Sequence, residues 1–150
     1  MDEQSRRADL RLPSIEDARC SDAQFIVDRG TELLVYENGK AFPFKVGRIF
    51  LVRAPRNEKR GGHAHKQCHQ VMVCIAGSCE IRVDDGAASK TVQLDRPTVA
   101  LHVPPLLWAE QIYRAADTTL MVLCDQLYDE ADYIRDPALF RRFRAERGQG

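Results

Sequence analysis

The sequence predicts a single all-β domain, a small barrel or sandwich, closed by short helices at its carboxyl end. The chain has 150 residues, which suits one domain and is too short for two ordinary ones. Seven short apolar runs, each ended by a turn signal, follow one another between residues 31 and 124. Strand-like and helix-like segments do not alternate, which favours a barrel or sandwich over a parallel α/β sheet.

The elements follow in order along the chain. Residues 1–23 are polar and irregular, and we interpret them as an extension that acts as an arm or a subunit contact, with residues 24–150 as the domain. Ser14 is placed to cap a short helix within this extension. Strands are predicted over residues 31–36, 44–52, 71–75, 79–83, 90–94, 99–103 and 119–124.

Two of these strands differ in pattern. Residues 79–83 alternate between apolar and charged side chains, as a strand does with one face on a core, whereas residues 71–75 are apolar throughout and should be covered on both faces. After residue 125 the pattern predicts one or two short helices, over residues 128–135 and 137–144.

Composition and charge exclude several classes of protein. Lys plus Arg and Asp plus Glu number 22 each, so the chain lacks the basic excess of a general nucleic-acid binder. Hydrophobic residues make up 44%, which excludes a disordered chain. No apolar stretch approaches the roughly 18 residues that a membrane-spanning helix needs, and no signal-peptide core follows Met1. We expect a cytoplasmic protein with no nucleic-acid or membrane partner.

The cysteines do not suggest a disulfide framework. There are five, an odd number, with no CxxC pair, and three of them fall inside apolar runs: Cys20, Cys68, Cys74, Cys79 and Cys124. We interpret them as small, reduced, mostly buried side chains without a catalytic role.

The histidines are the strongest candidates for chemistry. His63, His65 and His69 lie within seven residues, and His102 is the fourth histidine of the chain. Because alternate residues of a strand point to the same side, His63 and His65 should converge on one small site. An exposed cluster without function remains an equal alternative on the residues alone.

The spacing around these histidines resembles the first metal-binding motif of cupins, small β-barrels in which two His and a Glu bind a metal. Here Gln70 occupies the Glu position, and Ala109 stands near the His position of the second motif. A divalent metal needs about three or four protein ligands, so we expect a metal-free site in which imidazoles carry out proton transfer. A metal-dependent cupin that uses His63, His65 and His69 is the alternative.

Four ordered blocks, residues 60–66, 77–86, 103–108 and 128–136, resemble the sugar-nucleotide 3,4-ketoisomerases. These are small cupin enzymes related to the 3,5-epimerases of dTDP-sugar pathways. The resemblance implies an RmlC-like jelly roll that moves the carbonyl of dTDP-4-keto-6-deoxyglucose from C4 to C3 without a metal or organic cofactor. It also implies a 3-keto product destined for an aminotransferase, and a homodimer that often exchanges an amino-terminal strand.

The resemblance assigns roles to individual residues. His63 corresponds to the catalytic base and His65 to an assisting group. The residues expected to contact substrate are Arg48, Arg60, Lys66, Gln70 and Trp108.

One position departs from the family. Some relatives have a tyrosine, proposed to take part in proton transfer, where this chain has Phe50. That step then falls to His65, another tyrosine or water, and the C4 configuration of the product stays open. A 3,5-epimerase on the same substrate and a non-catalytic sugar-nucleotide-binding cupin remain alternatives.

Overall fold

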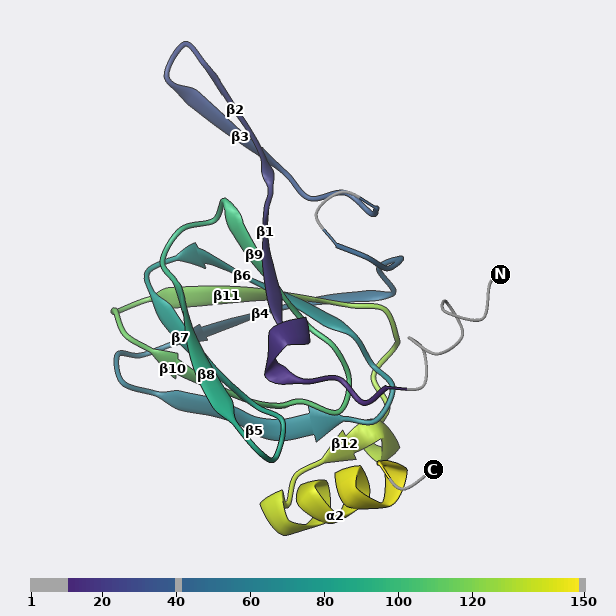
Figure 1. Cartoon of the computed structure of the whole chain (residues 1–150). Coiled ribbons are helices and arrows are strands. Elements are labelled where there is room, and N and C mark those ends of the chain that lie inside the picture. Colours follow the sequence, from purple (N-terminus) through teal and green to yellow (C-terminus); the bar gives the residue numbers. More distant parts are fainter. Residues whose placement is uncertain (1–10, 40–41, 149–150) are drawn as a thin grey trace.

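A computed structural model describes residues 11–39 and 42–148 of the chain. Two five-stranded antiparallel sheets face each other and enclose the core, and a separate two-stranded hairpin projects from them (Figure 1). The strand order is β1-β9-β6-β11-β4 in the larger sheet and β12-β5-β10-β7-β8 in the smaller one. The prediction of an all-β barrel with helical structure at its carboxyl end is confirmed.

The strands of the larger sheet are β1 (Arg19–Asp22), β9 (Val99–Val103), β6 (Gln70–Ala76), β11 (Thr118–Cys124) and β4 (Arg48–Ala54). Those of the smaller sheet are β12 (Tyr133–Ile134), β5 (Lys59–His65), β10 (Trp108–Tyr113), β7 (Cys79–Asp84) and β8 (Ser89–Leu94). The hairpin consists of β2 (Gln24–Asp28) and β3 (Thr31–Val35). The helical segments are the 3-10 turns η1 (Ile15–Asp17) and η2 (Glu130–Asp132) and the helix α2 (Pro137–Arg147).

The two strands singled out by their patterns behave as predicted. In β7, buried and half-buried residues alternate, and Ile81 and Val83 point into the core between the sheets. In β6, Met72 joins that core, whereas Val71 packs on the other face beneath Phe42. Residues 71–74 are therefore buried on both faces, whereas Ile75, at the end of the predicted run, is exposed.

The presumed amino-terminal extension contributes a strand to the larger sheet. Within the presumed extension, β1 pairs antiparallel with β9 and forms an edge of the larger sheet, while η1 with its cap Ser14 replaces the expected short helix. Residues 1–10 lie outside the described part of the chain. Conversely β2 and β3, assigned to the domain, extend away from the barrel (Figure 1).

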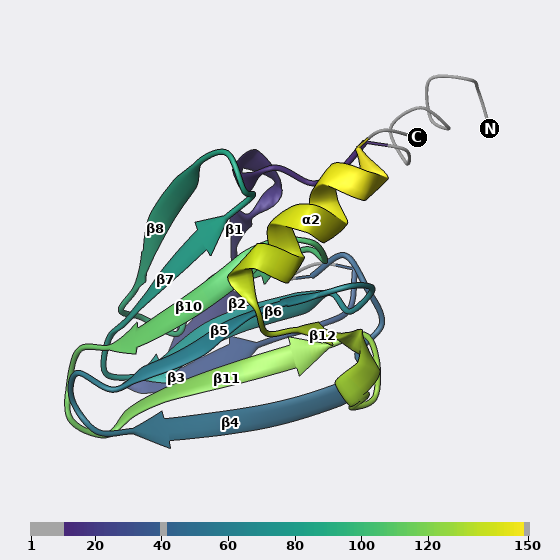
Figure 2. The same ribbon diagram turned by 90° about the horizontal axis from the view of Figure 1, so that it is seen from below.

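The carboxyl-terminal segment corrects one helix prediction. Residues 128–135 form only η2 and β12, because Tyr133 and Ile134 pair with β5 and so take an extended conformation. The helix expected after Pro137 is present as α2, with the Asp136 side chain accepting hydrogen bonds at its amino end. It lies across the outer face of the smaller sheet (Figure 2). Phe140 of this helix packs on Trp108. In the described part of the chain, no helix has the length and apolar character that crossing a membrane requires.

Candidate active site

A cavity of about 410 Å³ opens between the two sheets. Its walls come from β4, β5, β6, β10 and β12, so that both sheets contribute. It is lined by Phe50, Val52, Lys59, Arg60, Gly61, His63, Gln70, Gln111, Tyr133 and Arg135. A cavity of this size, with two amides, three cationic side chains and an imidazole, suits a polar, negatively charged small molecule.

Strand β5 brings the first two histidines together as predicted. The His63 and His65 rings stand perpendicular with their centroids 5.1 Å apart, while Ala64 between them faces α2 on the other side. The strand is locally irregular: Gly61 has a φ of +77°, and a Cβ there would lie 2.9 Å from the Ala109 carbonyl oxygen. Glycine at this position therefore allows the close approach to β10 at which the pairing register shifts.

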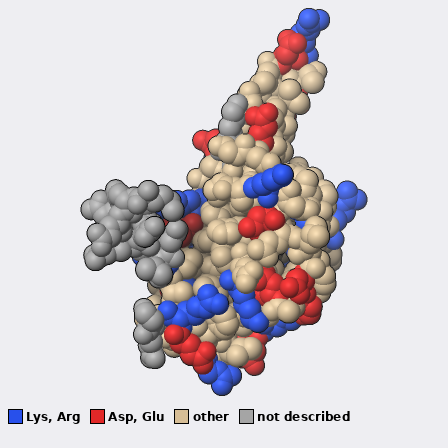
Figure 3. All heavy atoms as spheres, turned by 90° about the vertical axis from the view of Figure 1, so that its right-hand side faces the viewer, with Lys and Arg blue, Asp and Glu red and all other residues tan. Residues whose placement is uncertain are grey.

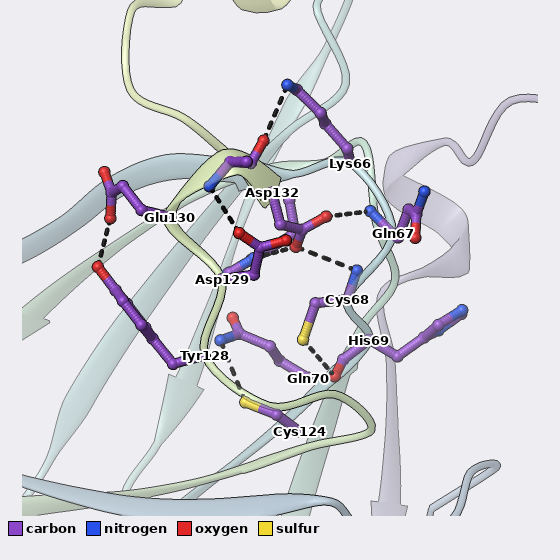
Figure 4. A network of polar contacts seen from close by, with 12 residues as sticks. Lys66, Gln67, Cys68, His69, Gln70, Cys124, Tyr128, Asp129, Glu130 and Asp132 are labelled. Atoms are coloured by element: carbon purple, nitrogen blue, oxygen red, sulfur yellow. Dashed lines mark hydrogen bonds and ion pairs between the residues drawn. The ribbon is translucent and has the colours of Figure 1, made fainter.

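His65 is held by a carboxylate that the sequence analysis did not single out. Asp132 Oδ2 lies 2.9 Å from His65 Nδ1, and the same carboxylate accepts hydrogen bonds from the backbone N–H groups of Gln67 and Cys68 (Figure 4). Because an ionised carboxylate only accepts, His65 carries its proton on Nδ1 and keeps a free lone pair on Nε2. The network thus fixes both the orientation and the tautomer of this imidazole.

Both histidines retain a ring nitrogen without a protein partner. His63 Nδ1 and His65 Nε2 are buried and have no hydrogen-bond partner among the residues that the structure describes. Tyr133 packs against both, with its ring centroid 4.9 Å from that of His63 and 4.4 Å from that of His65. Buried polar atoms normally find a partner, so free nitrogens beside a cavity are typical of a site that binds substrate.

Burial keeps these imidazoles neutral. The pKa of His63 falls to about 4, chiefly because burial disfavours the charged ring, and secondly because His65 and then Arg135 would repel its charge. Burial also lowers the pKa of His65, against the opposing effect of Asp132. At neutral pH His63 is therefore able to accept a proton.

The arrangement does not present a three-histidine metal site. His69 Nδ1 lies 3.0 Å from His102 Nε2, and both rings lie near Phe44, away from the His63 cavity. His65, Cys68 and Asp132 do bring potential ligand atoms within 4.8 Å of one another. The His65 and Asp132 atoms already bond to each other, however, so this cluster is better described as a network that orients the imidazole.

The residues predicted to contact substrate are divided between the cavity and other places. Arg60 and Gln70 line the cavity. Arg48 lies outside its lining, with its guanidinium over the Phe50 ring at 5.3 Å. Lys66 donates to the carbonyl of Ala131 at 2.9 Å, outside the cavity lining.

Trp108, which was predicted to contact substrate, does not line the cavity either. It points to the outer face of β10, where α2 covers it and its indole donates to Glu110 Oε1. Trp108 thus packs in a hydrophobic cluster with Ala64, Ile134 and Phe140.

Five polar residues of the site were missed as individual candidates: Lys59, Gln111, Asp132, Tyr133 and Arg135. Asp132, Tyr133 and Arg135 lie in the block 128–136, whose resemblance to the 3,4-ketoisomerases was the available signal for them.

The chain is similar to known proteins along most of its length. The family model described as "FdtA: WxcM-like, C-terminal" matches residues 16–145. A TDP-4-oxo-6-deoxy-alpha-D-glucose-3,4-oxoisomerase of Aneurinibacillus thermoaerophilus is 38% identical over 122 residues, which cover 81% of this chain and 88% of the relative.

Two solved structures are similar as well. A 3,4-ketoisomerase from Helicobacter canadensis superposes with a TM-score of 0.82 and 33% identity, covering 86% of this chain and 98% of the other. The sugar 3,4-ketoisomerase QdtA from Thermoanaerobacterium thermosaccharolyticum, in complex with TDP, superposes with a TM-score of 0.84 and 30% identity, covering 89% and 98%.

Proposed function

Because the chain belongs to the FdtA, WxcM-like family, we infer that it is a sugar-nucleotide 3,4-ketoisomerase. It acts on dTDP-4-keto-6-deoxyglucose and forms the corresponding 3-keto-6-deoxyhexose. The observation that carries this function is the pair of neutral imidazoles with free ring nitrogens, of which His63 lines the cavity and His65 packs against the lining residues His63 and Tyr133. Moving a carbonyl to the neighbouring carbon requires groups that both accept and return a proton, as imidazoles do near neutral pH.

The reaction assigns one role to each of three side chains. His63, which lines the cavity, takes the proton from C3 while the C4 oxygen gains a proton, giving an enediol. Tyr133 is the phenol that lines this cavity, so we assign it the donation to the C4 oxygen as charge develops there. The free Nε2 of His65, whose orientation Asp132 maintains, takes the proton of the C3 hydroxyl and delivers it to C4, and the proton held by His63 returns to the Tyr133 phenolate.

Binding supplies the remainder of the acceleration. A general base contributes about a hundred- to ten-thousandfold, so the substrate must also be held in place. Arg60 and Arg135 bring guanidinium groups to the cavity and suit the diphosphate. Gln70 and Gln111 offer amides to the sugar hydroxyls, and Arg48 supports this wall from behind.

Proton exchange tests the function directly. The protein is incubated with dTDP-4-keto-6-deoxyglucose in deuterated water and the sugar protons are followed by NMR. We expect the C3 proton signal to disappear and a 3-keto sugar to form, with the C5 proton retained. Exchange at C5 would indicate a 3,5-epimerase instead, and binding without any exchange would indicate a non-catalytic cupin.

We propose that the protein is a homodimer joined through its projecting hairpin. Phe25, Ile26, Val27 and Leu33 are exposed on β2 and β3, with exposed fractions from 43% to 59%. Figure 3 shows this hairpin standing clear of the body, with charged side chains at its tip. An isolated two-stranded hairpin is marginally stable in water, so it needs a surface to pack on, and a second copy supplies one.

Light scattering coupled to size-exclusion chromatography tests the dimer. Val27→Lys with Leu33→Glu should convert a dimer of about twice the chain mass into monomers. A wild-type protein that elutes as a monomer would contradict the proposal. The cytoplasmic location expected from the sequence likewise stays a prediction, which cell fractionation would test.

A further inference from the structure

Two buried amides line the cavity from opposite sheets. Gln70 begins β6 in the larger sheet, and Gln111 lies in β10 of the smaller one. Both belong to the cavity lining, and their exposed fractions are only 4% and 8%. A side-chain amide donates hydrogen bonds through its NH2 group and accepts them through its oxygen. Which end remains for a ligand therefore depends on which end the protein already occupies.

The oxygen of Gln111 is occupied by Tyr113. The hydroxyl of Tyr113, two residues farther along the same strand, donates to Gln111 Oε1 at 3.3 Å. Tyr113 is fully buried in the core, and burial raises its pKa, so the hydroxyl keeps the proton that it donates. Gln111 Nε2 has no hydrogen-bond partner among the residues that the structure describes. The group that Gln111 offers to a ligand is therefore a donor.

This donor lies close to the strand that carries the catalytic base. A Cβ at Gly61 would be 3.6 Å from Gln111 Cδ, and Gly61 precedes His63 by two residues in β5. Because β5 and β10 are neighbours in the smaller sheet, Gln111 and His63 belong to the same wall of the cavity.

Gln70 is held in the opposite orientation. Its Nε2 donates to Cys124 Sγ at 3.6 Å, so the amide nitrogen is turned toward the cysteine (Figure 4). Cys124 ends β11 directly opposite Gln70 in the larger sheet, and it is fully buried. In the described part of the chain, Gln70 Oε1 has no hydrogen-bond partner. The group that Gln70 offers to a ligand is therefore an acceptor.

A donor on one wall and an acceptor on the other match two different kinds of oxygen. A ketone oxygen only accepts hydrogen bonds, so of these two amides only Gln111 can bind it. The acceptor of Gln70 needs a hydrogen, which a hydroxyl supplies and a ketone does not. A sugar that presents the wrong group leaves a buried amide without its hydrogen bond, and a site built in this way discriminates strongly between polar ligands.

We propose that Gln111 and Gln70 determine the specificity of the site: Gln111 donates to the ketone oxygen of a 4-keto sugar, and Gln70 accepts from a hydroxyl of the same ring. The class of ligand is a hydroxyketone sugar attached to a nucleoside diphosphate. The inference rests on the proposed function for the identity of the sugar, and on the two fixed amides for the way in which the sugar is recognised.

A comparison of two sugar nucleotides tests the pair. TDP-4-keto-6-deoxyglucose has a ketone at C4, and TDP-6-deoxyglucose has a hydroxyl there and is otherwise the same. Their dissociation constants are measured by calorimetry at pH 8 in a His63→Asn background, which prevents turnover of the keto sugar.

Gln111→Glu replaces the donor by a second acceptor, while the carboxylate still accepts from Tyr113. We expect the ratio of the two dissociation constants to shift at least about tenfold in favour of the hydroxyl sugar, because a carboxylate accepts from a hydroxyl and repels a ketone oxygen.

Gln70→Glu is the matched control. It places the same negative charge in the same cavity, but it keeps the acceptor that Gln70 offers to the sugar. Its ratio should therefore stay within about threefold of that of the parent protein, and the affinity for TDP alone measures the effect of the charge in both variants. An equal shift in the two variants, or an unchanged ratio in Gln111→Glu, would overturn the proposal.

Gln111→Met keeps the proposal testable if Gln111→Glu fails to fold. This variant removes the donor without adding charge, and it should weaken the binding of both sugars about three- to tenfold relative to TDP. Undiminished binding of the keto sugar would contradict the role of Gln111. Isomerase activity is measured separately with His63 intact. Protein that shows these preferences but forms no 3-keto sugar would contradict the proposed function and leave the amide pair standing.

Discussion

The carboxylate of Asp132 lies 2.9 Å from Nδ1 of His65, although 67 residues separate the two in the chain. The contact depends on β12, in which Tyr133 pairs with His65 and brings the preceding aspartate over the end of β5. Asp132 does not line the cavity. It therefore acts on the reaction through His65, as a positioning residue that fixes which ring nitrogen is free.

Replacing this carboxylate should slow the reaction without weakening substrate binding. We expect Asp132→Asn to lower kcat about ten- to a hundredfold, because the amide no longer selects the Nδ1–H tautomer of His65. KM should change little, and the imidazole ¹⁵N shifts of His65 should report a changed tautomer population. Asp129→Asn is the matched control, since asparagine also caps a helical turn and Asp129 only caps η2. Equal losses in the two variants would contradict the assigned role.

The pH dependence of the reaction should reflect the low pKa of His63. Since burial, and then the charges of His65 and Arg135, lower this pKa to about 4, the base stays neutral and active well below pH 6.5. We expect kcat/KM, which reports the pKa values of the free enzyme, to stay flat from about pH 8 to pH 6 and to fall only as the pH approaches the pKa of His63. Arg135→Gln removes one of the charges that lower the pKa of His63. The loss of activity on the acid side of the pH profile should therefore begin at a higher pH. An acid limb near 6.5 in the wild type would contradict this environment for His63.

The sequence predicted the parts of the fold that depend on local patterns. The alternation in β7 and the continuous apolar run of β6 report directly which faces are buried, and both were predicted. Strand β5 was not predicted as a strand, because Gly61 and Gly62 interrupt it and its histidines give no apolar alternation.

In the site, too, only the features that depend on local patterns could be predicted. His63 and His65 converge because strand alternation requires it. Asp132 could not be placed from the sequence, since its partner belongs to a distant strand and its own segment has a helix-like pattern. Lys66 and Trp108 could not be placed either, because their directions depend on how α2 and the 128–135 segment cover β5 and β10.

Tyr133 should be needed for catalysis and dispensable for binding. Tyr133→Phe keeps the ring that packs against His63 and His65 and removes only the hydroxyl. We expect kcat to fall about ten- to a hundredfold, because the C4 oxygen loses its donor, while the affinity for TDP stays within about twofold. Tyr128→Phe is the control, since Tyr128 lies outside the cavity lining. Full activity in Tyr133→Phe would assign the proton donation to water or to His65.

The second pair of histidines should make the stability of the fold depend on pH. His102 Nε2 and His69 Nδ1 lie 3.0 Å apart, so one ring donates to the other and the pair carries a single proton at that contact. Burial, and then the charge that His69 would carry, lower the pKa of His102 to about 4, whereas in the unfolded chain it titrates near 6.5. The unfolded state therefore binds more protons between these values, and the stabilisation is present above pH 6.5 and is lost as the pH falls toward 4.

Urea unfolding of His102→Gln measures this contribution. At pH 7.5 the variant should be less stable by about 1 kcal/mol, because the histidine pair loses its hydrogen bond. Between pH 7.5 and pH 5 the urea midpoint of the wild type should fall more steeply than that of the variant, since the variant lacks one of the titrating groups. The two curves should thus approach each other on acidification. Midpoints that fall in parallel would show that His102 titrates alike in the folded and unfolded states.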